Sequence, residues 1–332
     1  MMPPSSLLTV TSLTVGIRRR GAPDTVIVDD VSFAISPGER FGIVGESGSG
    51  KSLTLRAIAD LLPKGVEVLS GSIRYDGREL VGMPQAERRM MMGPEIAMIF
   101  QEPMTALNPV LRVGEQIAEG PQRHLGLSKK AAMKLAIEMM ARTGIPDPVR
   151  RARAYPHELS GGLRQRIMIA MAVSCGPRLL LCDEPTTALD VTVQHQVLTV
   201  LEGLCDDTGT ALAFVTHDLA VVNQTCTDMA VMYSGHIVEG GPVAAVLGDP
   251  RHPYTKGLLD SAPDFDQPDR PLVPIPGFPP SLATRIAGCP FAPRCTFVVD
   301  GCLTALPARV MVAPGHDAAC IQSNSIFEGV VT

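Results

Sequence analysis

Three features of the 332-residue sequence predict an α/β fold. A glycine-rich segment, GESGSGKS at 45–52, follows a short apolar strand and opens a helix. A second apolar run, LLLCDE at 179–184, predicts a buried strand that ends in two acidic residues. Apolar and polar positions alternate through the first 40 residues, which indicates antiparallel strands. Strands and helices therefore share the chain.

The composition is that of an ordinary globular protein, with 45% hydrophobic and 19% charged residues. A net charge of −5 gives no basic surface for nucleic acid, and we expect the short run Arg18-Arg19-Arg20 in a solvated loop. The first residues lack the charged and apolar regions of a secretory signal. No apolar run reaches the roughly 18 residues of a membrane span. We therefore expect a cytosolic location, where disulfides are disfavoured.

Further elements follow from local patterns. A strand at 41–44 should lead into the glycine-rich loop, and residues 93–175 are expected to be mostly helical, with one helix between Ser128 and Gly144. ALAFVTHD predicts another buried strand, and MAVMYSGHIVEGG predicts a hairpin around Ser234-Gly235. Seven prolines within 263–280 predict an irregular linker.

The segment GESGSGKS matches the phosphate-binding pattern G-x-x-x-x-G-K-[ST] without a mismatch. Its glycines let backbone N–H groups surround phosphate oxygens at a helix N-terminus. Lys51 should reach the β- and γ-phosphates, and the Ser52 hydroxyl should bind Mg²⁺. The expected ATP-binding residues of this segment are Gly45, Ser47, Gly48, Ser49, Gly50, Lys51, Ser52 and Leu53.

The acidic pair after the second strand supplies candidates for hydrolysis. Asp183 is placed to hold Mg²⁺ directly or through water, and Glu184 to polarise the attacking water as general base. The alternative is that these acids merely cap a strand. His217, at the end of the strand ALAFVTH, is a candidate contact of the γ-phosphate, although a lone histidine is usually structural.

Four segments together identify a family. LSGGLRQR at 159–166 stands before DEPTTALD at 183–190, with IFQEP around Gln101 and THD around His217. This ordered set resembles the ATP-binding subunit of an ABC transporter over residues 7–245. The resemblance implies a P-loop ABC ATPase core, in which a RecA-like sheet and an antiparallel β subdomain are joined by a helical subdomain.

The resemblance also implies a head-to-tail dimer. ATP on the P-loop of one subunit would be covered by the signature residues Ser160, Gly161 and Gly162 of the other. Gln101 would contact ATP, Mg²⁺ and the attacking water. Asp190 would communicate across the dimer, and the roles of Glu184 as base and His217 as γ-phosphate contact would follow the family.

Two positions depart from the family's pattern. Leu163 replaces the usual glutamine of the signature, which should leave the site active because the serine and both glycines remain. Ile17 stands where an adenine-stacking aromatic is expected. Stacking on an aromatic is worth about 1–3 kcal/mol per base in nucleic-acid binders, so weaker base selectivity is expected.

Closer detail resembles the dipeptide/oligopeptide importer subgroup. The segments that carry this resemblance are GIVGESGSGKS, IFQEPMTALNP, GEQIAE and DEPTTALDVTVQ, and in the tail RHPYTKGLL, IPGFPPSL and GCPFAPRC. It implies an ATPase at the cytoplasmic face of the inner or plasma membrane. Its partners would be a second ATP-binding subunit, favouring a heterodimer, two transmembrane permease subunits and an extracytoplasmic solute-binding protein.

Alternatives remain for the solute and for the class. Close relatives take up nickel chelates, glutathione, sugars or other small solutes. A soluble ABC ATPase of DNA repair would carry a long insertion, yet only 58 residues separate Gln101 from Ser160. A translation-type ABC ATPase would normally carry two cassettes, and this chain has one.

The resemblance divides the chain into four segments. We expect the first part of the ATPase core with the P-loop at 1–92 and a helical subdomain ending in the signature at 93–175. The second part of the core follows at 176–245, and a Cys-rich C-terminal extension of the peptide-importer type at 246–332.

Eight cysteines fall into two sets. Those within predicted helices or strands are expected to be packing residues: Cys175, Cys182, Cys205 and Cys226. The tail set is separated by five, six and 17 residues: Cys289, Cys295, Cys302 and Cys320. Four thiolates suit a tetrahedral metal or an iron–sulfur cluster, and the spacing does not choose between them. The resemblance implies a [4Fe–4S] cluster, with Zn²⁺ or free thiols as alternatives.

Overall fold

The structure is a computed structural model that describes residues 6–19, 21–102, 106–187, 190–263, 271–280 and 287–323. The chain divides into two compact units. The signature unit comprises residues 1–7, 35–39 and 75–214, and the P-loop unit comprises residues 8–34, 40–74 and 215–332. The four segments expected from the sequence have other boundaries than these two units, and their limits stay a prediction.

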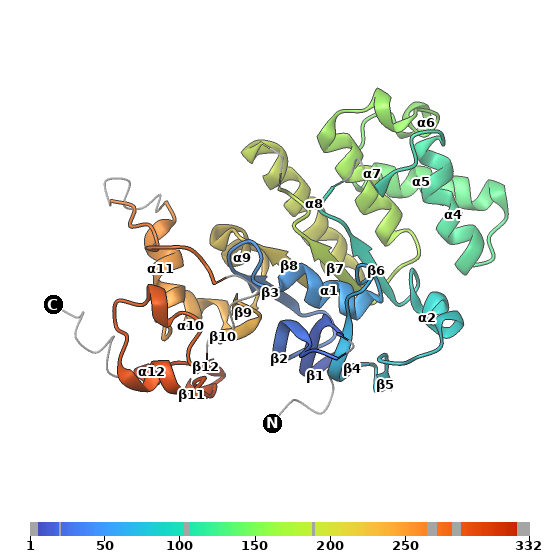
Figure 1. Cartoon of the computed structure of the whole chain (residues 1–332). Coiled ribbons are helices and arrows are strands. Elements are labelled where there is room, and N and C mark those ends of the chain that lie inside the picture. The colour runs from blue at the N-terminus through green and yellow to red at the C-terminus, as the bar shows by residue number, and fades with distance from the viewer. Residues whose placement is uncertain are drawn as a thin grey trace. The chain divides into compact units, whose positions relative to one another are not determined.

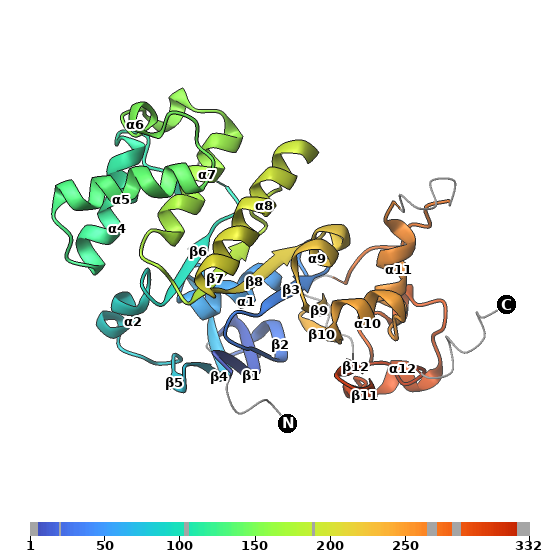
Figure 2. The ribbon, with the colours of Figure 1, turned by 180° about the vertical axis from the view of Figure 1, so that it is seen from behind.

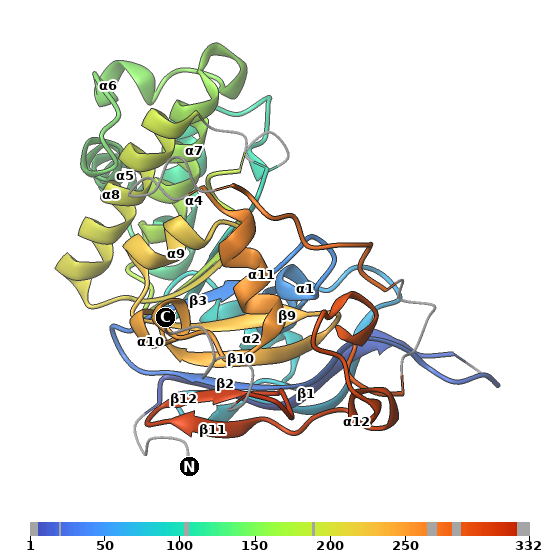
Figure 3. The same cartoon turned by 90° about the vertical axis from the view of Figure 1, so that its left-hand side faces the viewer.

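A mixed sheet forms the centre of the P-loop unit (Figure 1). Strand β3 (Arg40–Val44) runs parallel to β9 (Asp228–Tyr233), which pairs antiparallel with β10 (His236–Pro242). Two tail strands, β12 (His316–Ala318) and β11 (Val310–Ala313), extend the sheet beside β10 (Figure 3). The hairpin expected around Ser234-Gly235 is therefore confirmed, and the tail belongs to the same sheet as the P-loop strand.

The alternating pattern near the N-terminus forms the second sheet of this unit. Its strands are β2 (Thr25–Ile35), β1 (Leu8–Ile17) and β4 (Glu67–Tyr75), in that spatial order. Buried side chains alternate along β1 and β2, as expected for a sheet with one covered face. The strands predicted from the alternation are confirmed.

The α-helices in the described part of the P-loop unit are α1 (Lys51–Ala59), α9 (Leu219–Thr225), α10 (Val243–Gly248), α11 (Pro253–Ser261) and α12 (Asp300–Thr304). Helix α1 begins at Lys51, within the glycine-rich segment, as the sequence predicts. The helix ends before Pro63, because Asp60 adopts a left-handed backbone conformation. The N–H groups of Asp60 and Leu61 then donate to the carbonyl oxygens of Ala57 and Arg56.

In the signature unit, strands β8, β7 and β6 lie side by side in this spatial order. They are β8 (Ala211–Thr216), β7 (Leu179–Asp183) and β6 (Ile96–Ile99), and β6 runs parallel to β7. Strand β6 lies inside the range 93–175, so the expectation of a mostly helical segment is wrong at this point. All four residues of IAMI are buried, and so short an apolar run shows neither the period of a helix nor that of a strand.

Most of the range 93–175 is helical, as expected, and the unit has further helices outside this range (Figure 2). The described helices are α2 (Gln85–Met91), α4 (Val113–His124), α5 (Lys129–Arg142), α6 (Pro148–Arg151), α7 (Gly161–Val173) and α8 (Val191–Thr208), and a short strand β5 (Arg78–Glu79) precedes them. Ser128 caps α5 by accepting the N–H of Ala131 at 3.3 Å, and Gly144 follows its end at φ 70°. Helices α4, α5 and α7 enclose a core that includes Ile117, Met140 and Ile167.

Three of the four cysteines expected to be packing residues are buried: Cys182, Cys205 and Cys226. Cys175 is only partly buried, so that prediction holds for three of the set. Among the described residues, no helix is long and apolar enough to cross a membrane.

Candidate nucleotide-binding site

The P-loop connects the end of β3 to the first residue of α1, as the sequence predicts. Gly45 has φ 153°, and a Cβ atom there would lie 2.1 Å from the carbonyl oxygen of Met232. Gly50, the N-cap of α1, has φ 105°. Only glycine suits these two positions, which explains why the loop can bend so tightly at the start of the helix.

The polar side chains of the loop suit an anion. Lys51 is 4% exposed, and its Nζ donates to the carbonyl oxygens of Gly45 (2.7 Å) and Glu46 (3.0 Å). The Ser49 hydroxyl is buried and has no hydrogen-bond partner within the described part of the chain. A buried unpaired hydroxyl is unfavourable unless a ligand satisfies it. Ser52 and Leu53 follow in the first turn of α1, both partly buried.

The β9–β10 turn supports the loop from one side. Ser234 and Gly235 have φ values of 48° and 86°. The N–H of Gly235 donates to the carbonyl oxygen of Ser49 at 3.0 Å, and its own carbonyl oxygen accepts from Asp29 at 2.9 Å. The sequence predicts the turn, but it gives no signal that the turn contacts the P-loop.

The acidic pair lies at the end of β7 in the signature unit. Asp183 is fully buried, and Glu184 is 8% exposed with φ 47°. A left-handed conformation at a non-glycine residue costs about 1–3 kcal/mol and is enriched at functional sites. Gln101 donates to Glu184 Oε2 at 3.2 Å, so two predicted site residues meet. Thr187 Oγ1 donates to the same oxygen at 2.8 Å, a contact that the motif does not indicate.

The signature residues stand at the exposed N-terminus of α7. The Ser160 hydroxyl caps the helix by accepting the N–H of Leu163 at 3.4 Å. Nothing in the described chain lies within 4 Å of the position that a Cβ of Gly161 would take. A Cβ on Gly162, in contrast, would lie 2.7 Å from Val193 Cγ1, so this glycine allows close packing. Leu163 packs against the helical core.

The positions of Asp190 and His217 do not test their predicted roles, which involve a second subunit and a bound nucleotide. Asp190 caps α8 by accepting the N–H of Val193 at 2.9 Å. His217 is exposed directly after β8. Lys51 and Ser52 belong to the P-loop unit, whereas Asp183 and Glu184 belong to the signature unit. The assembly of all predicted residues around one nucleotide therefore stays a prediction.

The four tail cysteines line one cavity in the P-loop unit: Cys289, Cys295, Cys302 and Cys320. Backbone N–H groups contact three of the thiols, from Phe291 and Ala292, from Phe297 and from Gln322. Burial raises the pKa of Cys289 and Cys295, and that of Cys320 to about 11. Within the described ranges, no three Cys, His, Asp or Glu residues are arranged to hold a metal ion. The structure thus gathers the cysteines without showing a metal site.

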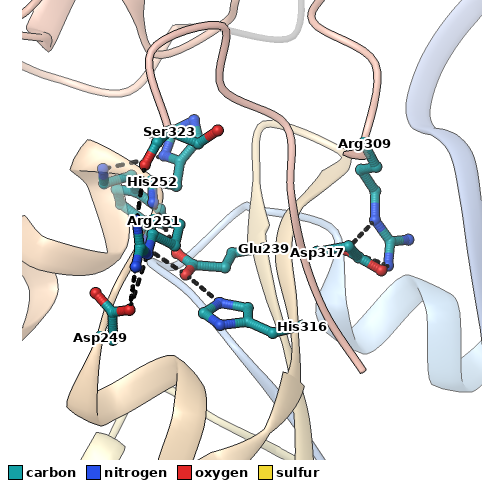
Figure 4. A network of polar contacts seen from close by, with 9 residues as sticks. Glu239, Asp249, Arg251, His252, Arg309, His316, Asp317 and Ser323 are labelled. Carbon is teal, nitrogen blue, oxygen red and sulfur yellow. Dashed lines mark hydrogen bonds and ion pairs between the residues drawn. The ribbon is translucent and has the colours of Figure 1, made fainter. Parts of the chain in front are cut away.

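Buried Glu239 ties the tail to β10 (Figure 4). Its carboxylate accepts the N–H groups of Arg251 (2.6 Å) and His252 (3.0 Å) and lies 2.8 Å from Nε2 of His316. Arg251 also pairs with Asp249. The start of α11 and strand β12 are therefore anchored to one carboxylate.

Two tail residues contact the P-loop itself. The Tyr254 hydroxyl accepts the N–H of Glu46, and the Arg294 guanidinium forms an ion pair with the Glu46 carboxylate. Sequence reasoning missed both residues and Glu46. The only signal was their place in the tail segments RHPY and GCPFAPRC, which mark the importer subgroup.

Comparisons with known proteins decide the family. The sequence family "ABC transporter" matches residues 28–187, and "Oligopeptide/dipeptide transporter, C-terminal region" matches residues 238–302. A probable peptide ABC transporter ATP-binding protein of Sinorhizobium fredii is 48% identical over 89% of each chain. The chain belongs to the ABC transporter ATP-binding proteins. A dipeptide transport ATP-binding protein of Escherichia coli, 44% identical over 95% of this chain and 96% of its own, is a further relative of this ABC protein.

Other relatives differ in length or are known as structures. The oligopeptide transport ATP-binding protein of Mycobacterium tuberculosis is 50% identical over 97% of this chain, which spans 53% of that relative. The solved ATP-binding cassette MJ0796, a dimer bound to ADP and Pi, superposes with a TM-score of 0.64 at 25% identity. The superposition covers 71% of this ABC protein and 98% of the cassette. The P-loop ABC ATPase fold predicted from the motifs is confirmed.

Proposed function

We propose that this chain is the ATP-hydrolysing subunit of an ABC importer for dipeptides or oligopeptides. The observation that carries the ATP assignment is the P-loop. Its buried Lys51 and its Ser49 hydroxyl, which has no partner among the described residues, offer a phosphate two polar groups at a helix N-terminus. The names of the relatives, which concern peptide transport and peptide import, support the solute class. The bound ADP and phosphate of the superposed cassette support the reaction.

The reaction divides between the two units. In the P-loop unit, the loop residues and Lys51 bind the phosphates, and His217 contacts the γ-phosphate. In the signature unit, Glu184 takes a proton from the attacking water, whose oxygen bonds to the γ-phosphorus. The bond from that phosphorus to the bridging oxygen breaks, which gives ADP and phosphate. Gln101 and Thr187 keep the Glu184 carboxylate in place for this proton transfer.

The donor groups of the site suit Mg²⁺, which prefers oxygen ligands. We assign Ser52, Gln101 and Asp183 as the residues that would hold it, through a hydroxyl, an amide oxygen and a carboxylate. Gln101 directs its amide nitrogen to Glu184, so its oxygen is the ligand of this assignment. When bound, the ion would neutralise part of the negative charge of the phosphates.

The signature residues act on the nucleotide of a second subunit. The exposed N-terminus of α7 favours this role, because the helix dipole and open N–H groups attract the γ-phosphate of an incoming ATP. Asp190 would pass the state of one site to the other. The dimeric state of the superposed cassette supports a head-to-tail dimer, and we propose a heterodimer with a related subunit.

The remaining partners follow from the importer assignment. Two transmembrane permease subunits would hold the dimer at the cytoplasmic face of the membrane, and an extracytoplasmic binding protein would deliver the solute. Nickel chelates, glutathione and sugars are the alternative solutes, and the permease and binding-protein genes beside this one would distinguish them. Co-purification with ribosomes rather than permeases would overturn the importer assignment.

ATPase activity with and without the permeases tests the mechanism, and the variant Glu184→Gln tests the base. We expect this variant to bind Mg-ATP normally and to hydrolyse it at least about 100-fold more slowly, because removal of a general base costs this much. Unchanged turnover would remove Glu184 as the base. Absence of ATP binding by the unaltered chain would overturn the proposal as a whole.

We further propose that the four tail cysteines hold a [4Fe–4S] cluster, with Zn²⁺ as the alternative. Their common cavity and the N–H groups directed at three of the thiols support this assignment, since such contacts stabilise thiolate ligands. An anaerobic preparation should contain iron and absorb near 400 nm. Zinc in elemental analysis would select the alternative, and protein without either metal would reject both.

A further inference from the structure

Glu46, the second residue of the P-loop, forms hydrogen bonds through its backbone N–H, its carbonyl oxygen and its carboxylate. Its N–H donates to the Tyr254 hydroxyl at 2.8 Å, and its carbonyl oxygen accepts from Lys51 Nζ at 3.0 Å. Its carboxylate takes two bonds from Arg294, Nη1 to Oε2 at 2.6 Å and Nη2 to Oε1 at 3.0 Å. Paired N–H···O bonds of this kind fix direction as well as distance. The backbone and the side chain of Glu46 are therefore both positioned from the C-terminal segment.

Arg294 is itself rigidly held, so it can transmit position. Its side chain is 4% exposed, its Nε donates to the carbonyl oxygen of Pro276 at 2.8 Å, and its Nη1 also donates to the Tyr233 hydroxyl at 3.2 Å. The guanidinium carbon lies 5.8 Å from the centre of the Tyr233 ring and 5.9 Å from that of Phe291. These contacts leave the guanidinium one orientation, toward the P-loop.

The same short turn links Arg294 to the cysteine cavity. It is a 3-10 turn (Ala292–Arg294) bracketed by Cys289, whose carbonyl accepts from Ala292 at 3.0 Å, and by Cys295, whose N–H donates to Ala292 at 3.2 Å. Phe291 lines the cavity, and its ring centre lies 5.2 Å and 5.4 Å from those of Tyr233 and Tyr254. The cysteine cavity is therefore connected by direct contacts to the residues that hold Glu46.

The function of this arrangement follows from how a P-loop binds. The loop must present several N–H groups at once, and ordering each of its residues costs backbone conformational entropy. A buried ion pair by itself adds little stability. Fixing the loop in its binding conformation, however, raises affinity because the ordering cost is met before the ligand arrives.

We propose that Arg294 and Tyr254 are positioning residues of the P-loop, through which the cysteine segment sets the affinity of the chain for ATP. This inference rests on the proposed function, since it assumes that the P-loop binds ATP. The cysteine segment is then a regulatory element of the nucleotide site, and disturbance of the cavity weakens ATP binding through Arg294.

The first test measures the affinity of the full chain for Mg-ATP in two variants, Glu46→Gln and Arg294→Lys. Glu46→Gln keeps the size of the side chain and Arg294→Lys keeps its charge, but each loses the paired ionic bonds. We therefore expect the dissociation constant and KM to rise about tenfold, with kcat at saturating ATP within about twofold. Arg309→Lys is the matched control. It removes another paired arginine–carboxylate contact of the tail, with Asp317, that does not reach the P-loop.

Three outcomes separate the possibilities. Unchanged ATP affinity in both variants would overturn the inference, as would an equal loss in Arg309→Lys, because the effect would then be one of general stability. Absence of ATP binding by the unaltered chain would instead overturn the proposed function on which the inference rests.

The second test addresses the link to the cavity. Cys295→Ser should weaken ATP binding about threefold in the unaltered chain and have no further effect in the Arg294→Lys background, because neighbours that share one contact are not additive. Cys175→Ser, in the signature unit, is the control. Equal effects of Cys295→Ser in both backgrounds would show that the cavity does not act through Arg294.

Discussion

Thr187 donates a hydrogen bond of 2.8 Å to Oε2 of Glu184, the same oxygen that accepts from Gln101. Glu184 directly follows β7 and stands in a left-handed backbone conformation, which is uncommon for a residue other than glycine. Two neutral donors on one carboxylate oxygen fix the rotation of the group. The orientation of the proposed base therefore depends on a threonine three residues further along the chain.

This contact predicts a specific effect on turnover. We expect Thr187→Val to lower kcat about tenfold, corresponding to about 1.4 kcal/mol, with unchanged ATP affinity. Thr187→Ser keeps the hydroxyl and should remain within about twofold of the unaltered chain. Steady-state ATPase assays and nucleotide titrations separate the two parameters. Equal kcat values for the valine and serine variants would show that the hydroxyl does not position the base.

The aliphatic residue Ile17 predicts weak selectivity for the nucleobase of the bound nucleotide. It ends β1 with 37% of its surface exposed, at the position where the family is expected to carry a stacking aromatic. We expect Ile17→Tyr to raise ATP affinity several-fold, since stacking contributes about 1–3 kcal/mol per base. Titrations with ATP and GTP measure the change. Ile17→Leu is the control for size, and affinities unaltered by the tyrosine would contradict the role of this position.

His252 predicts a loss of stability in acid. Its ring accepts the N–H of Tyr254 at 3.1 Å, and burial lowers its pKa to about 3, against about 6.5 in the unfolded chain. The unfolded state therefore binds more protons between these values. The contribution of His252 is complete above pH 6.5 and declines as the pH falls toward 3, by on the order of 1 kcal/mol per pH unit.

The variant His252→Asn isolates this contribution. Asparagine keeps an acceptor at the N-cap of α11 but does not titrate. The melting temperature should fall further between pH 7.5 and pH 5.5 in the unaltered chain than in the variant. Identical slopes with pH would mean that His252 does not account for the acid sensitivity.

The buried contact of His316 predicts that its loss lowers the free energy of unfolding rather than the ATPase activity. It lies 2.8 Å from Glu239, and both side chains are almost completely buried. The variant His316→Phe removes the imidazole from the buried Glu239 carboxylate and leaves it the N–H groups of Arg251 and His252, so it should lower the free energy of unfolding by about 3 kcal/mol. Asp317→Asn, whose partner Arg309 is partly exposed, should cost about 1 kcal/mol or less. Chemical denaturation compares the two, and equal costs would contradict the special role of the buried carboxylate.

Elements with a local pattern were predictable. The P-loop, the β9–β10 turn and the Ser128 cap depend on residues a few positions apart, and each forms where its motif indicates. Strand β6 was missed because four apolar residues carry no period. The tertiary neighbours of the strand, and not its own sequence, determine that segment.

The contacts of Glu46 show why the rest of the site could not be derived. Tyr254 and Arg294 lie 208 and 248 positions away from it along the chain. No periodicity or spacing relates residues so distant, because their meeting depends on how the tail strands join the sheet. Thr187 lies close to Glu184 in sequence, yet it meets the carboxylate only because the backbone turns at Glu184 itself.

The Ser234-Gly235 turn has a practical consequence for labelling this protein. Tips of two-residue hairpins are usual places for inserting an epitope or a fluorescent peptide. Here a Cβ on Gly235 would lie 2.3 Å from the carbonyl oxygen of Ile27. The N–H of Gly235 also donates to the carbonyl oxygen of Ser49 in the P-loop. An insertion at this tip would displace the nucleotide loop, so reporters belong elsewhere, for example at Gly126, where a Cβ would meet no described atom within 4 Å.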